Sequence, residues 1–128
     1  MSDVCVTVPK ALWQSWLAEG DLPGETAKHR SHFWIAKQPL PECVVGDRVY
    51  IVSHGRLRGY APLVGIEQVC SLRPERACLM REGGAVAVTI TEPIRGFMGW
   101  RYRWWPVDDE LPFVDWKTEG VPPAKGTV

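Results

Sequence analysis

The chain contains several short runs in which hydrophobic and polar residues alternate, and this period of two is typical of half-buried β-strands. Turns separate the runs, and two of them, at residues 54–55 and 83–84, have the composition of hairpin turns. Gly59 and Gly65 stand inside a predicted strand and indicate β-bulges or the close approach of another backbone. The predicted strands lie within residues 4–9, 33–37, 44–53, 54–69, 77–90 and 99–105.

Between the first two of these runs, hydrophobic side chains recur every three or four residues. This spacing predicts a short amphipathic helix that begins at Pro9 and ends at Gly20. Its apolar face is expected to pack on the core of the protein. That face consists of Leu12, Trp13, Trp16 and Leu17.

About six short strands and one or two helices in 128 residues indicate a single domain of the mainly β (α+β) class. We expect a small β-barrel of five to six strands with one or two short helices packed at its side, the second being a turn near residues 72–78. The compact domain is expected to span residues 1–106. Residues 107–128 are acidic and rich in proline, and they are expected to form an extension that lies partly extended over the domain and frays at its end.

The net charge is zero, with 15 Lys and Arg against 15 Asp and Glu, so the total charge alone indicates no polyanionic partner. Its distribution is uneven, however. Residues 28–60 carry six basic and two acidic side chains, which gives a local charge of +4. Residues 92–105 carry three basic side chains and one acidic side chain, which gives +2. Residues 1–27 and 106–120 are acidic, at −3 and −4. The chain can therefore present one basic face to a nucleic acid.

The four cysteines are far apart in the sequence and lack the Cys-x-x-Cys spacing of zinc sites, so they are expected to be buried, reduced thiols. The three histidines show no ligand spacing either, and we expect no metal and no cofactor. The chain opens on no apolar stretch like that of a signal peptide, and no apolar run approaches the length of a membrane span. These features predict a cytoplasmic protein. The cysteines are Cys5, Cys43, Cys70 and Cys78.

Residues 96–105, GFMGWRYRWW, concentrate aromatic and cationic side chains in one predicted strand. Because side chains alternate along a strand, one row is expected in the core and the other at the surface. Arginines and a tryptophan in the surface row can pair with phosphates and stack on a base. The core row is Trp100, Tyr102 and Trp104, and the surface row is Arg101, Arg103 and Trp105.

A second group of polar and cationic side chains lies at the predicted hairpin tip, SHGRLRGY. Arginine offers a planar fork for phosphate, a protonated histidine donates hydrogen bonds, and a tyrosine can stack. The group therefore predicts a rim of donors around the mouth of the barrel; the alternative is a solvated turn whose charges keep a sheet edge soluble. Its members are Ser53, His54, Arg56, Arg58 and Tyr60.

The order of a strand, a short helix, a loop and the run GDRVYIVSHGRLRGYAPLVGIE resembles the PUA-like superfamily and, within it, the ASCH and EVE domains. The stretch FWIAKQPLP is also similar to the opening strand of EVE domains, and the resemblance covers residues 4–105. Lys10 matches a position where ASCH-type pockets often keep a lysine; alternatively, it is an exposed residue of the first helical turn. The matching positions are Gly46, Asp47, Val49, Tyr50 and Ile51 in one strand and Gly59, Ala61 and Val64 in the next.

The resemblance implies a small β-barrel and a function on RNA or nucleotides. The chain lacks the ASCH signature Gly-x-Lys-x-x-Glu-x-Arg, for which it offers only GETAKHR at a different spacing, and it lacks the further aromatic motif of EVE pockets. The amidohydrolase residues of small ASCH proteins therefore have no counterparts that can be placed here. The likeness therefore supports the fold better than any specific activity, and it identifies no catalytic residue.

We expect a module that binds RNA or a modified nucleotide through a concave face lined by aromatic and arginine side chains. Two alternatives remain open: a small amidohydrolase acting on a modified nucleoside, and a phage or mobile-element accessory protein that acts through protein–protein contacts. The most useful observation for choosing among these hypotheses is whether Trp34, Arg58, Tyr60 and Arg103 converge on one pocket. The full set of candidate binding residues is Lys10, Trp34, Ser53, His54, Arg56, Arg58, Tyr60, Arg101, Arg103 and Trp105.

Overall fold

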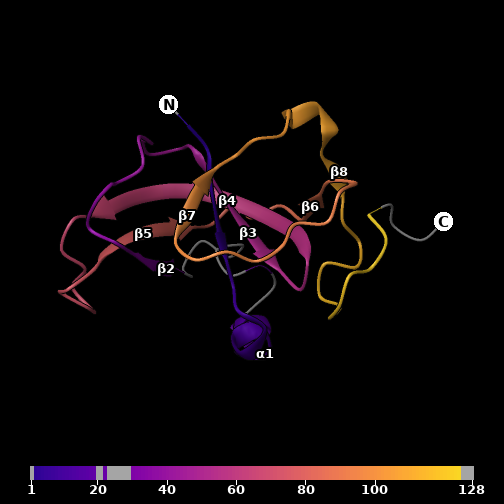
Figure 1. The fold of residues 1–128 in the computed structure, drawn as a ribbon, viewed down its shortest axis with the longest axis horizontal. Coiled ribbons are helices and arrows are strands. Elements are labelled where there is room, and N and C mark those ends of the chain that lie inside the picture. Colours follow the sequence, from indigo (N-terminus) through magenta and orange to yellow (C-terminus); the bar gives the residue numbers. More distant parts are fainter. Residues whose placement is uncertain (1, 20–21, 23–29, 125–128) are drawn as a thin grey trace.

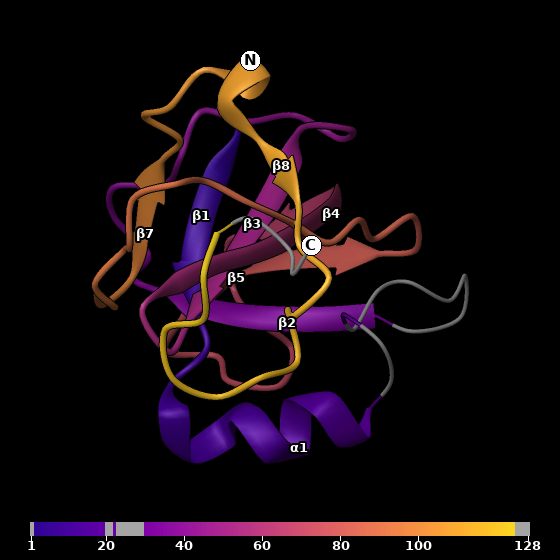
Figure 2. The same cartoon turned by 90° about the vertical axis from the view of Figure 1, so that its right-hand side faces the viewer.

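The computed structural model describes residues 2–19, 22 and 30–124 of the chain. Its main strands are β1 (Val4–Thr7), β2 (Arg30–Ile35), β3 (Arg48–Ser53), β4 (Arg56–Glu67), β5 (Ala77–Glu82) and β7 (Trp100–Tyr102). They form one sheet in the order β2-β5-β4-β3-β1-β7, which curls into a half-barrel (Figures 1 and 2). β1 and β3 run parallel, and the other neighbouring pairs are antiparallel.

Shorter elements flank the curled sheet. They are η1 (Lys10–Leu12), α1 (Trp13–Ala18), β6 (Val88–Thr89), η2 (Val107–Asp109) and β8 (Leu111–Pro112). β6 and β8 pair in a small second sheet, and α1 lies at one end of the half-barrel, below β2 in Figure 2. The mainly β class predicted from the sequence is confirmed. Within the described residues, no helix has the length and apolar character needed to cross a membrane.

The central strands bury side chains on both faces of the sheet. Val6 of β1 and Ile51 of β3 enter a core that also contains the two buried tryptophans of α1. Their sequence neighbours Cys5 and Tyr50 enter a second core, together with residues that follow β5. Because both faces are covered, these strands appear in the sequence as nearly continuous hydrophobic runs instead of strict alternation.

β4 contains the irregularities predicted from its glycines. The pairing with β3 shifts register after Ile51, which lies opposite Gly59, and the pairing with β5 shifts at Gly65. Gly59 has a φ of 155°, and a Cβ there would lie 2.5 Å from the carbonyl oxygen of Val86. That close approach allows the backbones of Tyr60 and Val86 to exchange hydrogen bonds of 3.0 and 2.8 Å.

Three predicted elements differ from the structure. The hairpin expected over residues 77–90 is wrong, because β5 lies between β2 and β4 and has no free edge for residues 85–90. After β5 the chain returns to β4 at an isolated bridge between Val86 and Tyr60, and β6 pairs with β8. The helical turn expected at residues 72–78 is a non-helical loop that leads into β5. The last strand ends at Tyr102 because β7 pairs only with the short strand β1.

The predicted apolar face of the helix is correct for its tryptophans and wrong at its first residue. Trp13 and Trp16 are buried, and Leu17 packs partly buried against the same core. Leu12 is 56% exposed, because it belongs to the tighter turn η1, where side-chain directions differ from those of an α-helix.

The C-terminal segment covers the sheet and joins its core. Phe113 and Trp116 belong to the same buried cluster as the tryptophans of α1, and Ala124 is also buried. Residue 106 therefore does not mark the limit of the core. The fraying expected at the end of the chain concerns residues 125–128, which lie outside the described part.

Trp13 offers a test of the helix packing. Its side chain is fully buried, its ring meets Trp116 edge-on at 6.3 Å, and its Nε1–H donates to the carbonyl of Lys117 at 3.2 Å. We expect Trp13→Ala to lower the free energy of unfolding by about 3–5 kcal/mol, because it leaves a large cavity. Leu12→Ala, in the preceding turn, should change it by less than about 1 kcal/mol. Denaturant unfolding of both variants would contradict this helix orientation if the two losses were equal.

Candidate functional site

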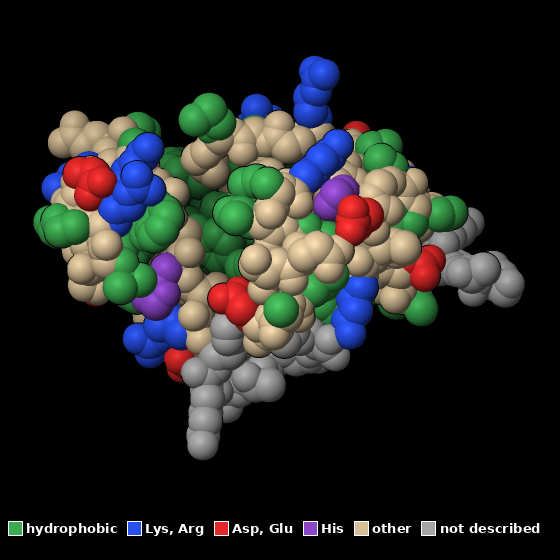
Figure 3. All heavy atoms as spheres, turned by 90° about the horizontal axis from the view of Figure 1, so that it is seen from below, with side chains coloured by type: hydrophobic (Ala, Val, Ile, Leu, Met, Phe, Trp, Pro, Cys, Tyr) green, Lys and Arg blue, Asp and Glu red, His purple; other side chains and the backbone are tan. Residues whose placement is uncertain are grey.

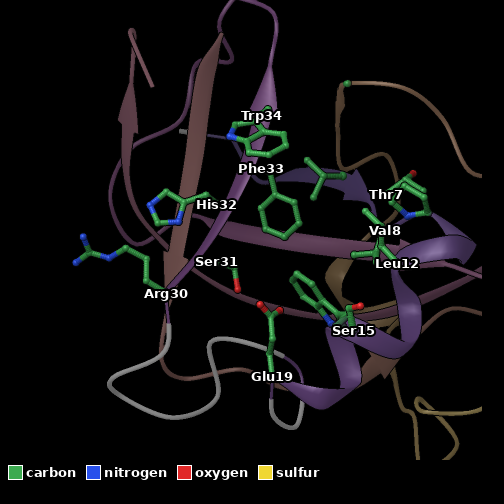
Figure 4. A pocket seen from close by; sticks show the side chains of 14 residues that line it. Thr7, Val8, Leu12, Ser15, Glu19, Arg30, Ser31, His32, Phe33 and Trp34 are labelled. Carbon is green, nitrogen blue, oxygen red and sulfur yellow. The ribbon is translucent and has the colours of Figure 1, made fainter. Parts of the chain in front are cut away.

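A cavity of about 500 Å³ opens between α1, β1 and β2. Figure 3, which views the molecule from below, shows a hollow with hydrophobic side chains on this side. The close-up in Figure 4 shows β2 side chains along one wall and Leu12 and Ser15 along the other. Val6 and Val8 of the first strand region add apolar surface. The gap left by the incomplete closure of the barrel thus becomes a concave site with an apolar lining.

Aromatic rings form much of the cavity wall. Trp16 of α1 and Phe33 of β2 lie 5.4 Å apart between ring centroids. Trp34, the next residue along β2, is 49% exposed at the cavity edge, and the guanidinium of Arg73 lies 4.8 Å from its ring centre. The buried Arg81 lies behind the first pair, 5.4 Å from the ring centre of Trp16. The aromatic surface is therefore held in place from behind and remains open toward the cavity.

Two buried polar atoms of the lining have no hydrogen-bond partner among the described residues: Trp16 Nε1 and Ser31 Oγ. Buried polar groups are almost always paired, so two unpaired atoms in one cavity point to a missing partner. Figure 4 shows the Ser31 oxygen and the Glu19 carboxylate directed toward each other across the cavity floor, with no hydrogen bond between them. Both atoms are buried, so a molecule in the cavity reaches them only after a movement of the neighbouring side chains.

Charged groups stand at the mouth of the cavity. Arg30 belongs to the lining, and its Nε lies 3.2 Å from Glu82 Oε1, with half of the arginine side chain exposed. His32 and Glu19 are the other titratable groups of the lining among the described residues. The mouth therefore carries both signs of charge, and one partly neutralised guanidinium is its main cation.

Arg58 lies away from the cavity and inside the protein. Its guanidinium is fully buried and donates to five backbone carbonyls, and burial, with a smaller effect of Arg56, lowers its pKa to about 10. The expectation that Arg58 contacts a phosphate is therefore wrong, because its donors are bonded to protein backbone. The accepting carbonyls, with their distances, are Ser53 (2.9 Å), His54 (3.2 Å), Trp116 (3.0 Å), Thr118 (2.6 Å) and Gly120 (2.8 Å).

Three other candidates are also structural. Arg56 is buried and donates to the carbonyls of Pro122, Ile90 and Thr91 at 2.8, 3.3 and 2.9 Å. The Ser53 hydroxyl donates to the carbonyl of Val8 at 2.7 Å. Trp105 is buried, and its Nε1–H donates to Glu110 at 2.9 Å. The expectation that these three side chains are exposed at a binding surface is therefore wrong.

His54 and Tyr60 take part in packing. His54 Nδ1 accepts a hydrogen bond of 3.3 Å from the N–H of Gly120, and burial, followed by the nearby Arg58, holds the pKa of His54 below its usual value. Tyr60 packs on Tyr50, with ring centroids 5.2 Å apart, and under the guanidinium of Arg48 at 4.1 Å.

The remaining candidates lie at other surfaces. Lys10 is exposed in η1, as its alternative interpretation held, and is not part of the cavity lining. Arg101 is exposed beside Phe97, and Arg103 pairs with Asp3 at 3.2 Å and donates to the carbonyl of Trp105. Trp34 therefore lies in the cavity, whereas Arg58, Tyr60 and Arg103 do not. These four residues do not converge on one pocket.

The two rows predicted for the last strand are also corrected. Tyr102 and Trp104, expected in the core, are 41% and 48% exposed, and Trp105, expected at the surface, is buried. At Trp104 and Trp105 the alternation fails because β7 ends at Tyr102, after which the chain is no longer a strand. Tyr102 itself lies in the edge strand β7, and its hydroxyl accepts a hydrogen bond from the N–H of Glu42.

The residues predicted for the site do not include Trp16, Ser31 and Phe33, which line the cavity. A signal was present in β2, where Ser31 occupies the same inward row as Phe33 and Ile35. A hydroxyl in an otherwise apolar row is a candidate for ligand contact. Trp16 was assigned to the core alone, although its ring also faces the cavity.

All four cysteines are free thiols; Cys5, Cys70 and Cys78 are buried, and Cys43 is half-buried. The expectation that cysteine spacing leaves no metal-ligand set needs correction, since the fold brings Cys70 and Cys78 together with Glu67.

Replacing Arg58 tests its structural role. Arg58→Met keeps a long apolar stem but leaves five carbonyls without their donor, each of which costs about 1–3 kcal/mol where it stays buried. We expect a loss of at least about 3 kcal/mol in unfolding free energy and faster proteolysis of residues 113–124. Arg101→Met, at an exposed position, serves as the control and should change neither the unfolding free energy nor the rate of proteolysis. Equal stability of the two variants would contradict the assigned role.

His54 predicts a component of the pH dependence of stability. Its pKa is lowered in the folded state, so the unfolded chain binds the proton more tightly, and stability falls as the pH drops through about 6.5. His54→Asn removes the titration, and asparagine tolerates the left-handed backbone at this position, where φ is 48°. Chemical unfolding between about pH 7.5 and 5.5 should give a flatter profile for the variant. Parallel profiles would rule out this assignment.

In comparisons with known proteins, no family model, no curated protein and no solved structure matches this chain. The function must therefore be inferred from the site itself.

Proposed function

We propose that this protein is a binding module for a nucleobase, presented by RNA or by a modified nucleotide, and that the base enters the cavity between α1 and β2. The observation that carries the proposal is a cavity whose wall contains the aromatic side chains Trp16, Phe33 and Trp34. A nucleobase has a flat apolar face that can stack on such a wall.

The size and lining of the cavity suit this ligand class. A volume of about 500 Å³ lies within the range of small-molecule sites, which are mostly apolar with a few directing polar groups. Phe33 lies on the inward row of β2, and Trp34, on the other row, offers its exposed ring at the edge of the cavity for stacking. The Ser31 hydroxyl can donate or accept, so it does not by itself select one base.

Electrostatics should contribute little to affinity. Arg30 is the arginine at the mouth, its charge is shared with Glu82, and the whole chain is neutral. We therefore expect one phosphate contact at most and a shallow dependence of affinity on salt. This differs from the steep dependence that several exposed arginines would give.

The lining favours binding over the amidohydrolase alternative. Ser31 and His32 are adjacent on a strand, so their side chains point to opposite faces and do not form a nucleophile and base. Lys10, which the hydrolase hypothesis would use, lies outside the lining.

The test is a fluorescence titration with nucleosides, nucleotides and single-stranded RNA at low and high salt. Trp34→Ala should weaken binding by about 1–3 kcal/mol through lost stacking, with an unchanged salt slope. Trp104→Ala is the matched control, because Trp104 is 48% exposed, nearly as much as Trp34 at 49%, and lies outside the lining. It should leave affinity intact.

Ser31→Ala separates a ligand-binding role from a structural one. It removes a buried hydroxyl that has no partner among the described residues, so unfolding free energy should be unchanged or higher, and weaker binding would place Ser31 in contact with the ligand. The proposal is overturned if no nucleoside, nucleotide or single strand binds at low salt, or if Trp34→Ala and Trp104→Ala behave alike. Absence of binding together with co-purification of a polypeptide would support the protein-partner alternative.

A further inference from the structure

A group of metal-ligating side chains lies at the junction of β4 and β5, outside the cavity lining. Glu67 is the last residue of β4, Cys78 is the second residue of β5, and Cys70 lies in the loop between them (Figure 1). One ligand atom from each of the three lies within 4.8 Å of the other two. The two sulfurs are buried, and the glutamate is half-buried.

We propose that Glu67, Cys70 and Cys78 form a binding site for a thiophilic divalent cation, with zinc as the best match. Two thiolates and a carboxylate are ligands that zinc accepts in tetrahedral sites, whereas magnesium and calcium require oxygen ligands. Cys78 Sγ and Glu67 Oε1 are 3.3 Å apart, close to the edge of about 3.5 Å between sulfur and oxygen ligands of tetrahedral zinc. Three protein ligands leave the fourth position for water.

The loop that carries Cys70 is held by its own hydrogen bonds. The N–H of Cys70 donates to the carbonyl of Arg76 at 2.8 Å, and the carbonyl of Cys70 accepts from the N–H of Arg73 at 3.1 Å. The N–H of Ser71 donates to Glu67 Oε1 at 3.3 Å. These bonds fix the loop against the end of β4, so the ligands are brought together before a cation binds.

Thiols bind a cation as thiolates, so cation binding at this cluster is coupled to the loss of their protons. Burial opposes ionisation of Cys70, but hydrogen bonds from Cys78 and from the backbone at Leu72 and Arg73 together hold the pKa of Cys70 below its ordinary value. Burial, together with the neighbouring Cys70 and Glu67, raises the pKa of Cys78 to about 12. A cation would replace the proton on Cys78 and any proton left on Cys70, so binding releases up to two protons.

The Arg73 side chain of the same loop is occupied elsewhere. Its Nε pairs with Glu75 Oε2 at 3.1 Å, and its guanidinium lies over the ring of Trp34. The cluster does not depend on the proposed nucleobase cavity, and either assignment can fail without the other.

The experiment is a titration of the reduced full-length chain with Co²⁺, followed by displacement with Zn²⁺, in the presence of a reductant that is not a thiol. We expect one Co²⁺ per chain, with thiolate-to-cobalt charge-transfer absorption that Zn²⁺ abolishes. Cys70→Ser and Glu67→Gln should each weaken binding, more than about a hundredfold for the cysteine, because loss of a direct ligand exceeds the effect of an outer-shell change. Cys43→Ser is the matched control, since it removes a cysteine outside the cluster.

Glu67→Gln keeps the shape of a half-exposed side chain, so it remains informative if Cys70→Ser fails to fold. Thermal unfolding of the metal-free variants verifies that each is native. The proposal is overturned if the reduced wild-type chain shows no charge-transfer band, if Cys43→Ser removes the band as strongly as Cys70→Ser, or if Glu67→Gln binds Co²⁺ like the wild type.

Discussion

The buried guanidinium of Arg58 is the interaction on which the arrangement of this protein depends. It binds carbonyls at the β3–β4 turn and carbonyls of the C-terminal segment, and so ties residues more than 50 positions apart. The segment so held presents Trp116 to Trp13, and Trp13 fixes α1 against the open side of the half-barrel. Because α1 also carries Trp16, the buried guanidinium of Arg58 indirectly positions this part of the cavity wall.

A buried cation without a carboxylate partner is costly, and its lowered pKa reflects that cost. The surrounding backbone provides the compensation, since five carbonyl dipoles converge on one planar fork that has five N–H donors. Lysine could not substitute for this geometry, because it has three donors at a single point. The local basic charge of residues 28–60 is thus partly internal, and counting charges along the sequence overestimates the basic surface.

Local patterns predicted the elements well and their partners poorly. Hydrophobic pattern and turn chemistry, which act over a few residues, account for most strands, for the turn after Ser53 and for the burial of Trp13 and Trp16. The bulge at Gly59 was also predictable, because a glycine inside a strand packs no side chain and usually marks a bulge or a close backbone contact. The pairing of residues 85–90 was not predictable, because β2 pairs with the edge of β5 that the predicted hairpin would have used. The burial of Arg58 likewise depends on carbonyls supplied from the other end of the chain, and no local pattern records them.

The proposed base site and the proposed cation site both lie near the open edge of the half-barrel, where the regular sheet ends. β2 is an edge strand, so its side chains meet α1 on one side without another strand between them, and Trp34 remains half-exposed. In the β2–β5 register Trp34 lies opposite Cys78, and Arg73 of the Cys70 loop covers its ring. Trp34 therefore adjoins both the proposed base site and the proposed cation site. Any effect that one ligand has on the other through this residue must be equal in both directions, because coupling between two binding equilibria is reciprocal.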